Sequence, residues 1–204
     1  MVQYESLESS DVYVATLTLL PVTRLVKKGI EFDISITIRS TSNNKVIWGA
    51  FNSFLVFHSH KYPISTLAVE EGSNEISSEV HKLTAAKNVP LSSDVGRKYA
   101  LLCGDWNPVH ISKITAKLFG FKMAIAHGMY ISALAISALQ REGIFPKTYP
   151  VTVEVIFRRP CFIPTSINVS YSYVHLATNS NTVKFSVLQS ETANTLIRGQ
   201  CYAD

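Results

Sequence analysis

The stretch HGMYISALAISALQREG, residues 127–143, determines the fold class that the sequence predicts. Apolar residues recur along one face of the expected helix, at Ile131, Leu134, Ala135, Ala138 and Leu139. Met129 and Ile136 add apolar side chains away from that face, and polar residues gather only at the end, before Gly143, which is a suitable helix C-cap. A helix that is apolar nearly all round is expected to be buried nearly all round.

The segments around this helix have the patterns of strands. After it come four strand-like runs at 151–158, 166–175, 182–189 and 195–202. Before it, residues 12–20 and 30–38 alternate, and residues 45–57 are rich in β-branched and aromatic side chains, with Pro21 expected to end the first run. One long buried helix followed by an antiparallel sheet predicts an α+β fold in which the sheet wraps around the helix.

A polar stretch at residues 70–78 predicts a linker, which divides the chain into a β region at 1–80 and a main domain at 81–204. The main domain should open with a strand near residues 81–86. A short helix should follow, with Ser92 or Ser93 as its N-cap and Asp94 in its first turn. The run SKITAKLFGF suggests a second short helix that ends at Gly120.

Composition excludes several classes of partner. The net charge of the 204-residue chain is +4, and no Lys/Arg run exceeds two residues, so nucleic-acid binding is not expected. The N-terminus is acidic and lacks an apolar core, and the longest apolar run, 123–139, is short for a membrane span. We therefore expect a cytoplasmic protein with no membrane partner.

The sequence encodes no clear metal site. Three cysteines, Cys103, Cys161 and Cys201, form no C-x-x-C pair, so neither a disulfide framework nor a zinc site is expected. His58 and His60 would share one face of a strand, but no third ligand accompanies them.

The loop YALLCGDWNPVHIS, residues 99–112, carries the first chemical signal. Asn107 and Pro108 favour a turn, so the side chains of Asp105 and His110 can converge on one water molecule and perform general acid/base catalysis. The alternative is a solvated turn in which Asp105 caps backbone N–H groups. A third possibility pairs Cys103 with His110 as nucleophile and base, although a small buried cysteine is the commoner role.

The segment AIAHGMY, residues 124–130, carries the second signal, at the start of the buried helix. Gly128 has no side chain, so a carbonyl oxygen can approach its N–H, and the helix N-terminus would stabilise a developing oxyanion there. The alternative is a glycine required only for close packing.

Together these two segments resemble the hydratase motif of the MaoC-like acyl dehydratases, the R-specific 2-enoyl-CoA hydratases. The family pattern Y-A-x-x-S-G-D-x-N-P-[IV]-H, followed by G-F-x-x-x-I-A-H-G-M, matches residues 99–129. A looser similarity covers residues 85–204. Residues 22–57 look like part of the N-terminal half of double-hotdog members, which implies an incomplete first hotdog unit at 1–80 and a hydratase hotdog domain at 81–204.

The resemblance implies reversible hydration of a trans-2-enoyl thioester to an (R)-3-hydroxyacyl thioester, carried by coenzyme A or acyl carrier protein. Catalysis would fall to Asp105 and His110, which hold the water, and to the Gly128 N–H, which binds the thioester carbonyl. No metal or redox cofactor is implied. Supporting or substrate-binding positions would be Tyr99, Cys103, Asn107, Pro108, His127 and Arg158.

Two positions depart from the family pattern. Cys103 stands where serine is usual, and Ser112 replaces a common aspartate. Because hotdog sheets leave an edge strand that a second subunit can cover, we expect a homodimer. The alternative functions are a non-catalytic acyl-thioester-binding protein and a thioesterase on the same fold.

Overall fold

The computed structural model describes residues 1–26, 29–57, 83–175 and 181–203. The chain forms two compact units. The first comprises Met1–Glu79 with Tyr149–Thr152, and the second comprises Val80–Thr148 with Val153–Asp204. Among the described residues, no helix is long and apolar enough to cross a membrane.

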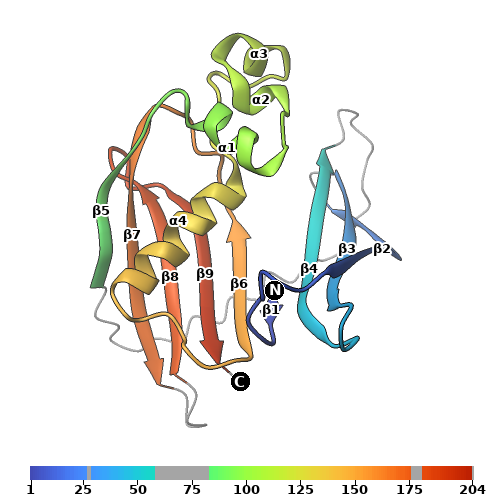
Figure 1. The fold of residues 1–204 in the computed structure, drawn as a ribbon. Coiled ribbons are helices and arrows are strands. Elements are labelled where there is room, and N and C mark those ends of the chain that lie inside the picture. Colours follow the sequence, from blue (N-terminus) through green and yellow to red (C-terminus); the bar gives the residue numbers. More distant parts are fainter. Residues whose placement is uncertain (27–28, 58–82, 176–180, 204) are drawn as a thin grey trace. The chain divides into compact units, whose positions relative to one another are not determined.

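The second unit is a helix packed on an antiparallel sheet. Figure 1 shows helix α4, Gly128–Arg141, lying along one face of this sheet. The strands follow the spatial order β6-β9-β8-β7-β5. They are β5 (Leu83–Leu91), β6 (Val151–Phe157), β7 (Thr165–His175), β8 (Asn181–Gln189) and β9 (Thr195–Ala203). This arrangement confirms the predicted α+β hotdog fold, in which a sheet wraps around a long helix.

One face of α4 forms the centre of the core. Its buried residues are Ile131, Ser132, Ala135, Ala138 and Leu139. The expectation that the helix is buried nearly all round is wrong, because Met129 is half exposed and Ala133 is exposed. The helix ends at a Glu142 C-cap, and Gly143 follows with φ of 69°, the left-handed conformation that favours glycine.

Three short helices connect β5 to α4. They are α1 (Val95–Cys103), α2 (Pro108–Ile111) and α3 (Lys113–Leu118). The predicted cap of α1 was wrong, because Asp94 occupies the N-cap position. The Asp94 carboxylate instead accepts a hydrogen bond from Ser92 and pairs with Lys98 at 2.9 Å, one turn further on.

The described part of the first unit is antiparallel β structure. Strands β2 (Tyr13–Val26), β3 (Gly29–Ser40) and β4 (Val46–Phe57) pair in sequence, and β1 (Val2–Gln3) pairs with β4. Contrary to expectation, Pro21 does not end β2. The strand lies at the sheet edge and its register shifts between Leu19 and Thr23, so the missing N–H of proline is tolerated there.

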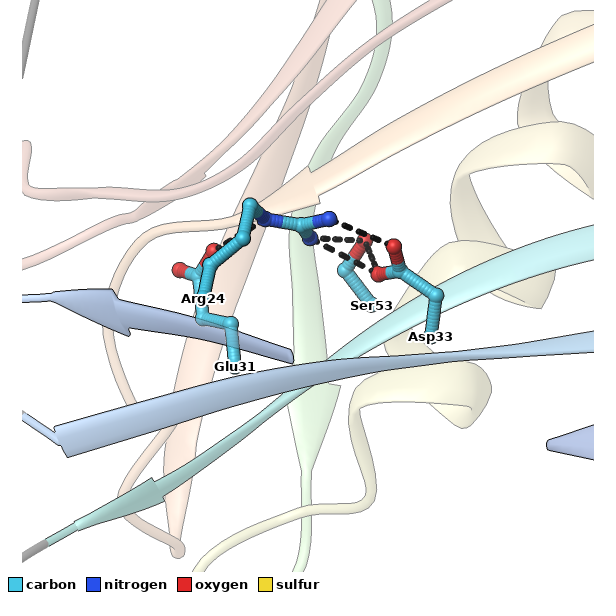
Figure 2. Close-up of polar contacts among 4 residues, drawn as sticks. All are labelled: Arg24, Glu31, Asp33 and Ser53. Carbon is cyan, nitrogen blue, oxygen red and sulfur yellow. Dashed lines mark hydrogen bonds and ion pairs between the residues drawn. The ribbon is translucent and has the colours of Figure 1, made fainter. Parts of the chain in front are cut away.

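An ion pair between the half-exposed Arg24 and a buried carboxylate ties the three long strands of this unit together (Figure 2). Arg24 on β2 contacts both carboxylate oxygens of Asp33 on β3, at 2.6 and 2.8 Å, and Ser53 on β4 donates to the same carboxylate at 2.6 Å. Asp33 is only 3% exposed. The hydrogen bonds from Arg24, followed by that from Ser53, lower the pKa of Asp33 to about 2.

We expect the stability contributed by Asp33 to depend on pH. Its pKa in the folded protein lies below the ordinary value of 3.8, so the ionised carboxylate stabilises the fold above that value and the contribution is lost as pH falls toward 2. Asp33→Asn should therefore lower the melting temperature at pH 7, and the difference from wild type should shrink under acid conditions. Melting followed by circular dichroism measures both.

Glu31→Gln provides the matched control, because Glu31 makes a single 3.4 Å contact with Arg24 and is more exposed. It should lower the melting temperature much less. A difference between Asp33→Asn and wild type that stays constant from pH 7 to pH 3 would contradict the assigned role of the ion pair.

Candidate active site

The loop between α1 and α2 is held by its own side chains. Gly104 adopts φ of 75° at the end of α1, which turns the chain toward Asp105. One oxygen of Asp105, Oδ1, accepts the Asn107 N–H at 3.1 Å. Asn107 in turn caps α2 by accepting the Val109 N–H at 3.3 Å, and Pro108 occupies the first helical position.

The contacts of the Asp105 carboxylate are compatible with both roles that the sequence left open. Its Oδ1 caps the turn, and its Oδ2 lies 3.9 Å from His110 Nε2. That separation is too long for a direct hydrogen bond and short enough for one water molecule to contact both atoms. Asp105 is half exposed, whereas His110 is 9% exposed.

The tautomer of His110 follows from one contact. His110 Nδ1 lies 2.8 Å from the carbonyl oxygen of Ile125. Because a carbonyl oxygen only accepts, Nδ1 carries the hydrogen, and in the neutral ring Nε2 then presents a lone pair toward Asp105. His110 is thus oriented as a base.

Burial lowers the pKa of His110 below its usual value of 6.5, and the neighbouring His127 lowers it further. The hydrogen bond to Ile125 and the charge of Asp105 act in the opposite direction. The net shift keeps His110 neutral near pH 7, as a proton acceptor requires.

His127 lies against the same pair. Its Nε2 is 3.0 Å from the carbonyl oxygen of Asp105 and 3.7 Å from Asp105 Oδ2, and its ring stacks on that of His110 with centroids 3.7 Å apart. Asp105, His110 and His127 could by proximity hold a metal ion. The stacking of the two imidazole rings argues against it. A ring nitrogen binds a metal that lies in the plane of its ring, and two stacked rings inclined by only 26° do not direct their lone pairs at a common point.

Gly128 begins α4 and lines a cavity together with His110. The N–H groups of the first turn of a helix have no intrahelical partner, so this end of α4 offers donors to a ligand in the cavity. Gly128 also packs closely, because an added Cβ would lie 2.8 Å from the Phe157 ring. The geometry is compatible with both interpretations of Gly128, as a backbone N–H donor to a ligand and as a glycine required for close packing.

The cavity has a volume of about 290 Å³, at the small end of ligand sites. Apart from His110 and Gly128, its walls are mainly apolar, and two arginines lie at one side. The remaining lining residues are Ile125, Ala126, Ile131, Phe157, Arg158, Arg159, Pro160, Cys161, Leu196 and Ile197. Burial raises the pKa of the Cys161 thiol to about 11, so this thiol is uncharged near neutral pH.

Comparison with known proteins shows the family of this chain. The family model described as MaoC like domain matches residues 77–195, more than half of the chain. The chain belongs to the MaoC-like dehydratase family.

Two relatives by sequence carry dehydratase names. The 3-hydroxyacyl-thioester dehydratase X of Mycobacterium tuberculosis is 41% identical over 70 residues, covering 34% of this chain and 24% of that protein. The mitochondrial 3-hydroxyacyl-[acyl-carrier-protein] dehydratase of Arabidopsis thaliana is 30% identical over 108 residues, covering 52% of this chain and 64% of that protein. The chain thus spans less than two thirds of the length of either relative.

The fold is also shared with a solved structure. The crystal structure of HtdX from Mycobacterium tuberculosis superimposes with a TM-score of 0.72 at 22% identity, covering 100% of this chain and 74% of that one. This likeness concerns the fold alone, and it shows that the MaoC-like domain has the hotdog architecture.

The remaining predicted site residues of this MaoC-like domain lie in different settings. Tyr99, on α1, places its ring 5.0 Å from that of His127, and burial raises its pKa. Cys103 is exposed, so the expectation of a small buried cysteine is wrong there, and it makes no polar contact with His110 among the described residues. His58 and His60 lie outside the described residues.

Arg158 and Arg159 differ in how they are held. The guanidinium of Arg159 donates to Asn194, whereas that of Arg158 has no hydrogen-bond partner within the described parts of the chain. Both side chains are exposed where they line the cavity. Arg158 therefore lies at the cavity with its donors available to a ligand.

Sequence reasoning missed Gly96, which supports the site from α1. An added Cβ at Gly96 would lie 1.9 Å from the carbonyl oxygen of His110, so only glycine allows α1 and α2 to approach this closely. The adjacent Arg97 donates to the Ile111 carbonyl at 2.9 Å and fastens the two helices. The available signal was a glycine inside a helical segment, where it costs stability unless packing requires it.

We expect Gly96→Ala to separate α1 from α2 and to disturb His110. Such overpacking should lower the free energy of unfolding by about 1–3 kcal/mol. Denaturant titration measures that loss, and the ring signals of His110 in NMR spectra should shift. Leu101→Ala, at an exposed position of the same helix, is the control and should change neither. Wild-type stability together with unshifted His110 signals in Gly96→Ala would rule out this packing constraint.

Proposed function

We propose that this chain catalyses the reversible addition of water to a trans-2-enoyl thioester, giving an (R)-3-hydroxyacyl thioester. The supporting observation is that Asp105 Oδ2 and the unprotonated His110 Nε2 lie 3.9 Å apart, so that both can accept hydrogen bonds from one water molecule. They lie beside a cavity lined by Gly128 at the start of α4. A water molecule between the two bases would face a substrate whose carbonyl oxygen points at the N-terminus of α4.

The proposed reaction balances within the site. The oxygen of the bound water forms a bond to the β-carbon while His110 Nε2 accepts a proton from it. The π electrons of the double bond move toward the thioester carbonyl, and the resulting enolate oxygen is stabilised by the Gly128 N–H and by the helix dipole. The proton held by the Asp105–His110 pair is then returned to the α-carbon. Dehydration follows the same steps in reverse.

The thioester itself accepts the electron pair, so the proposed mechanism requires neither a metal nor a redox cofactor. Coenzyme A and acyl carrier protein both carry a phosphate group at the end of the pantetheine arm opposite the thioester, and the available guanidinium of Arg158 is suited to bind such a phosphate. We also propose a homodimer, because β5 forms an edge of the second unit's sheet and can pair with another copy.

The direct test is a hydration assay on crotonyl-CoA, following loss of the enoyl absorbance and formation of the 3-hydroxyacyl product. Asp105→Asn and His110→Ala each remove one base and should lower kcat by about 10²–10⁴-fold. Glu142→Gln, at the exposed C-cap of α4, is the control and should leave the rate unchanged.

Other outcomes of this assay would favour the alternative functions. Release of free thiol without a 3-hydroxyacyl product would replace the proposal with a thioesterase. Binding of the thioester without turnover would replace it with an acyl-thioester-binding protein.

The pH dependence of kcat/KM supplies a second prediction. Protonated His110 cannot accept a proton from water, so activity should fall as pH drops through the pKa of this residue. Because that pKa is lowered, the acid limb should have its midpoint below pH 6.5. Initial rates in buffers from pH 5 to 8 measure it, and a midpoint clearly above 6.5 would be inconsistent with a buried neutral base.

A further inference from the structure

His127 occupies an unusual position for a residue that precedes a helix. It is the N-cap of α4, yet its side chain makes no capping hydrogen bond to the helix. The ring is 3% exposed and is turned toward the loop between α1 and α2. It does not line the cavity beside His110 and Gly128.

The contacts of this ring reach both proposed bases. Its Nε2 is 3.0 Å from the carbonyl oxygen of Asp105, and since a carbonyl only accepts, Nε2 must carry the hydrogen. Its face lies against the face of His110 with ring centroids 3.7 Å apart, and Tyr99 approaches at 5.0 Å. One side chain thus fixes the backbone at one base and the ring plane of the other.

This orientation leaves a polar atom of His127 without a partner. Nε2 donates to the Asp105 carbonyl, whereas Nδ1 is buried with no hydrogen-bond partner among the described residues. An unsatisfied buried polar atom costs free energy, so its presence needs an explanation. A phenylalanine would avoid that cost while filling a similar volume, but it would lose the bond to Asp105.

We propose that His127 is a positioning residue, which sets the separation and orientation of Asp105 and His110 through its Nε2–H bond to the Asp105 carbonyl and its stack on the His110 ring. The inference rests on the proposed hydration. His127 acts through these two residues, so its loss should reduce kcat much more than it changes KM.

The charged and titratable groups around His110 determine its pKa. Asp105 faces its Nε2, and His127 covers one ring face. Cys161, Arg158 and Arg159 line the adjoining cavity. Of these, only His127 stacks on the imidazole, so its replacement should remove one contribution that disfavours protonated His110.

Two variants separate the two contacts of His127. His127→Phe keeps a flat ring against His110 but removes the donor to Asp105, and His127→Gln keeps an amide donor but removes the stack. Met129→Leu, at a half-exposed position on the same turn of α4, is the control. Misplacement of the bases by about 1 Å should cost kcat on crotonyl-CoA on the order of 10²-fold in His127→Phe, with KM within about threefold of wild type.

NMR titration of His110 gives a readout that needs no activity. Its pKa should rise toward 6.5 in both His127 variants and stay at the wild-type value in Met129→Leu. This measurement separates the two proposals, because a wild-type chain that does not hydrate crotonyl-CoA would refute the proposed function while the titration still tests His127.

Three results would overturn the inference. The first is wild-type kcat in His127→Phe together with an unshifted His110 titration. The second is an increase in KM that accounts for the whole loss of activity, since His127 would then contact substrate. The third is loss of cooperative melting in both variants, because His127 would then maintain the fold itself and not the geometry of the loop.

Discussion

The hydrogen bond from His110 Nδ1 to the carbonyl oxygen of Ile125 is the constraint on which the site depends. At 2.8 Å it joins two residues that are 15 positions apart in the chain, one in helix α2 and one in the segment before α4. It fixes which nitrogen carries the hydrogen, and so it determines that the lone pair of Nε2 faces Asp105. Without this bond the His110 ring could rotate or change tautomer. His110 Nε2 and Asp105 Oδ2 would then no longer be held as two acceptors on either side of one water molecule.

Two glycines allow close contacts around the residues that form and flank this bond. Gly96 lets α1 approach the backbone of His110, and Gly128 lets the Phe157 ring lie over the start of α4. Each glycine removes a Cβ where two elements meet beside the cavity. At Gly96 two main chains meet, whereas at Gly128 a side-chain ring covers the start of the helix. Arg97 then fastens α1 to α2.

Much of this arrangement could be predicted from sequence. The helical period of α4 and the alternation of apolar residues in the strands are local signals. The residue types of the Asp-x-Asn-Pro turn likewise predict its side-chain-to-backbone hydrogen bonds. The errors arose where tertiary context prevails. Pro21 remains within β2 because that strand lies at an edge, and Cys103 is exposed because α1 ends on the surface. The stack of His110 on His127 joins residues 17 positions apart, and no local pattern encodes it.

The tautomer of His110 provides the most direct test of how this site is built. Long-range ¹⁵N–¹H correlation spectra distinguish a protonated Nδ1 from a protonated Nε2 in each imidazole ring, and Ile125 and Asp105 offer the two alternative partners. At pH 7.5 we expect a neutral His110 ring with hydrogen on Nδ1 and an unprotonated Nε2. A neutral ring with hydrogen on Nε2, or an imidazolium carrying both, would contradict the proposed role of His110 as the base that faces Asp105.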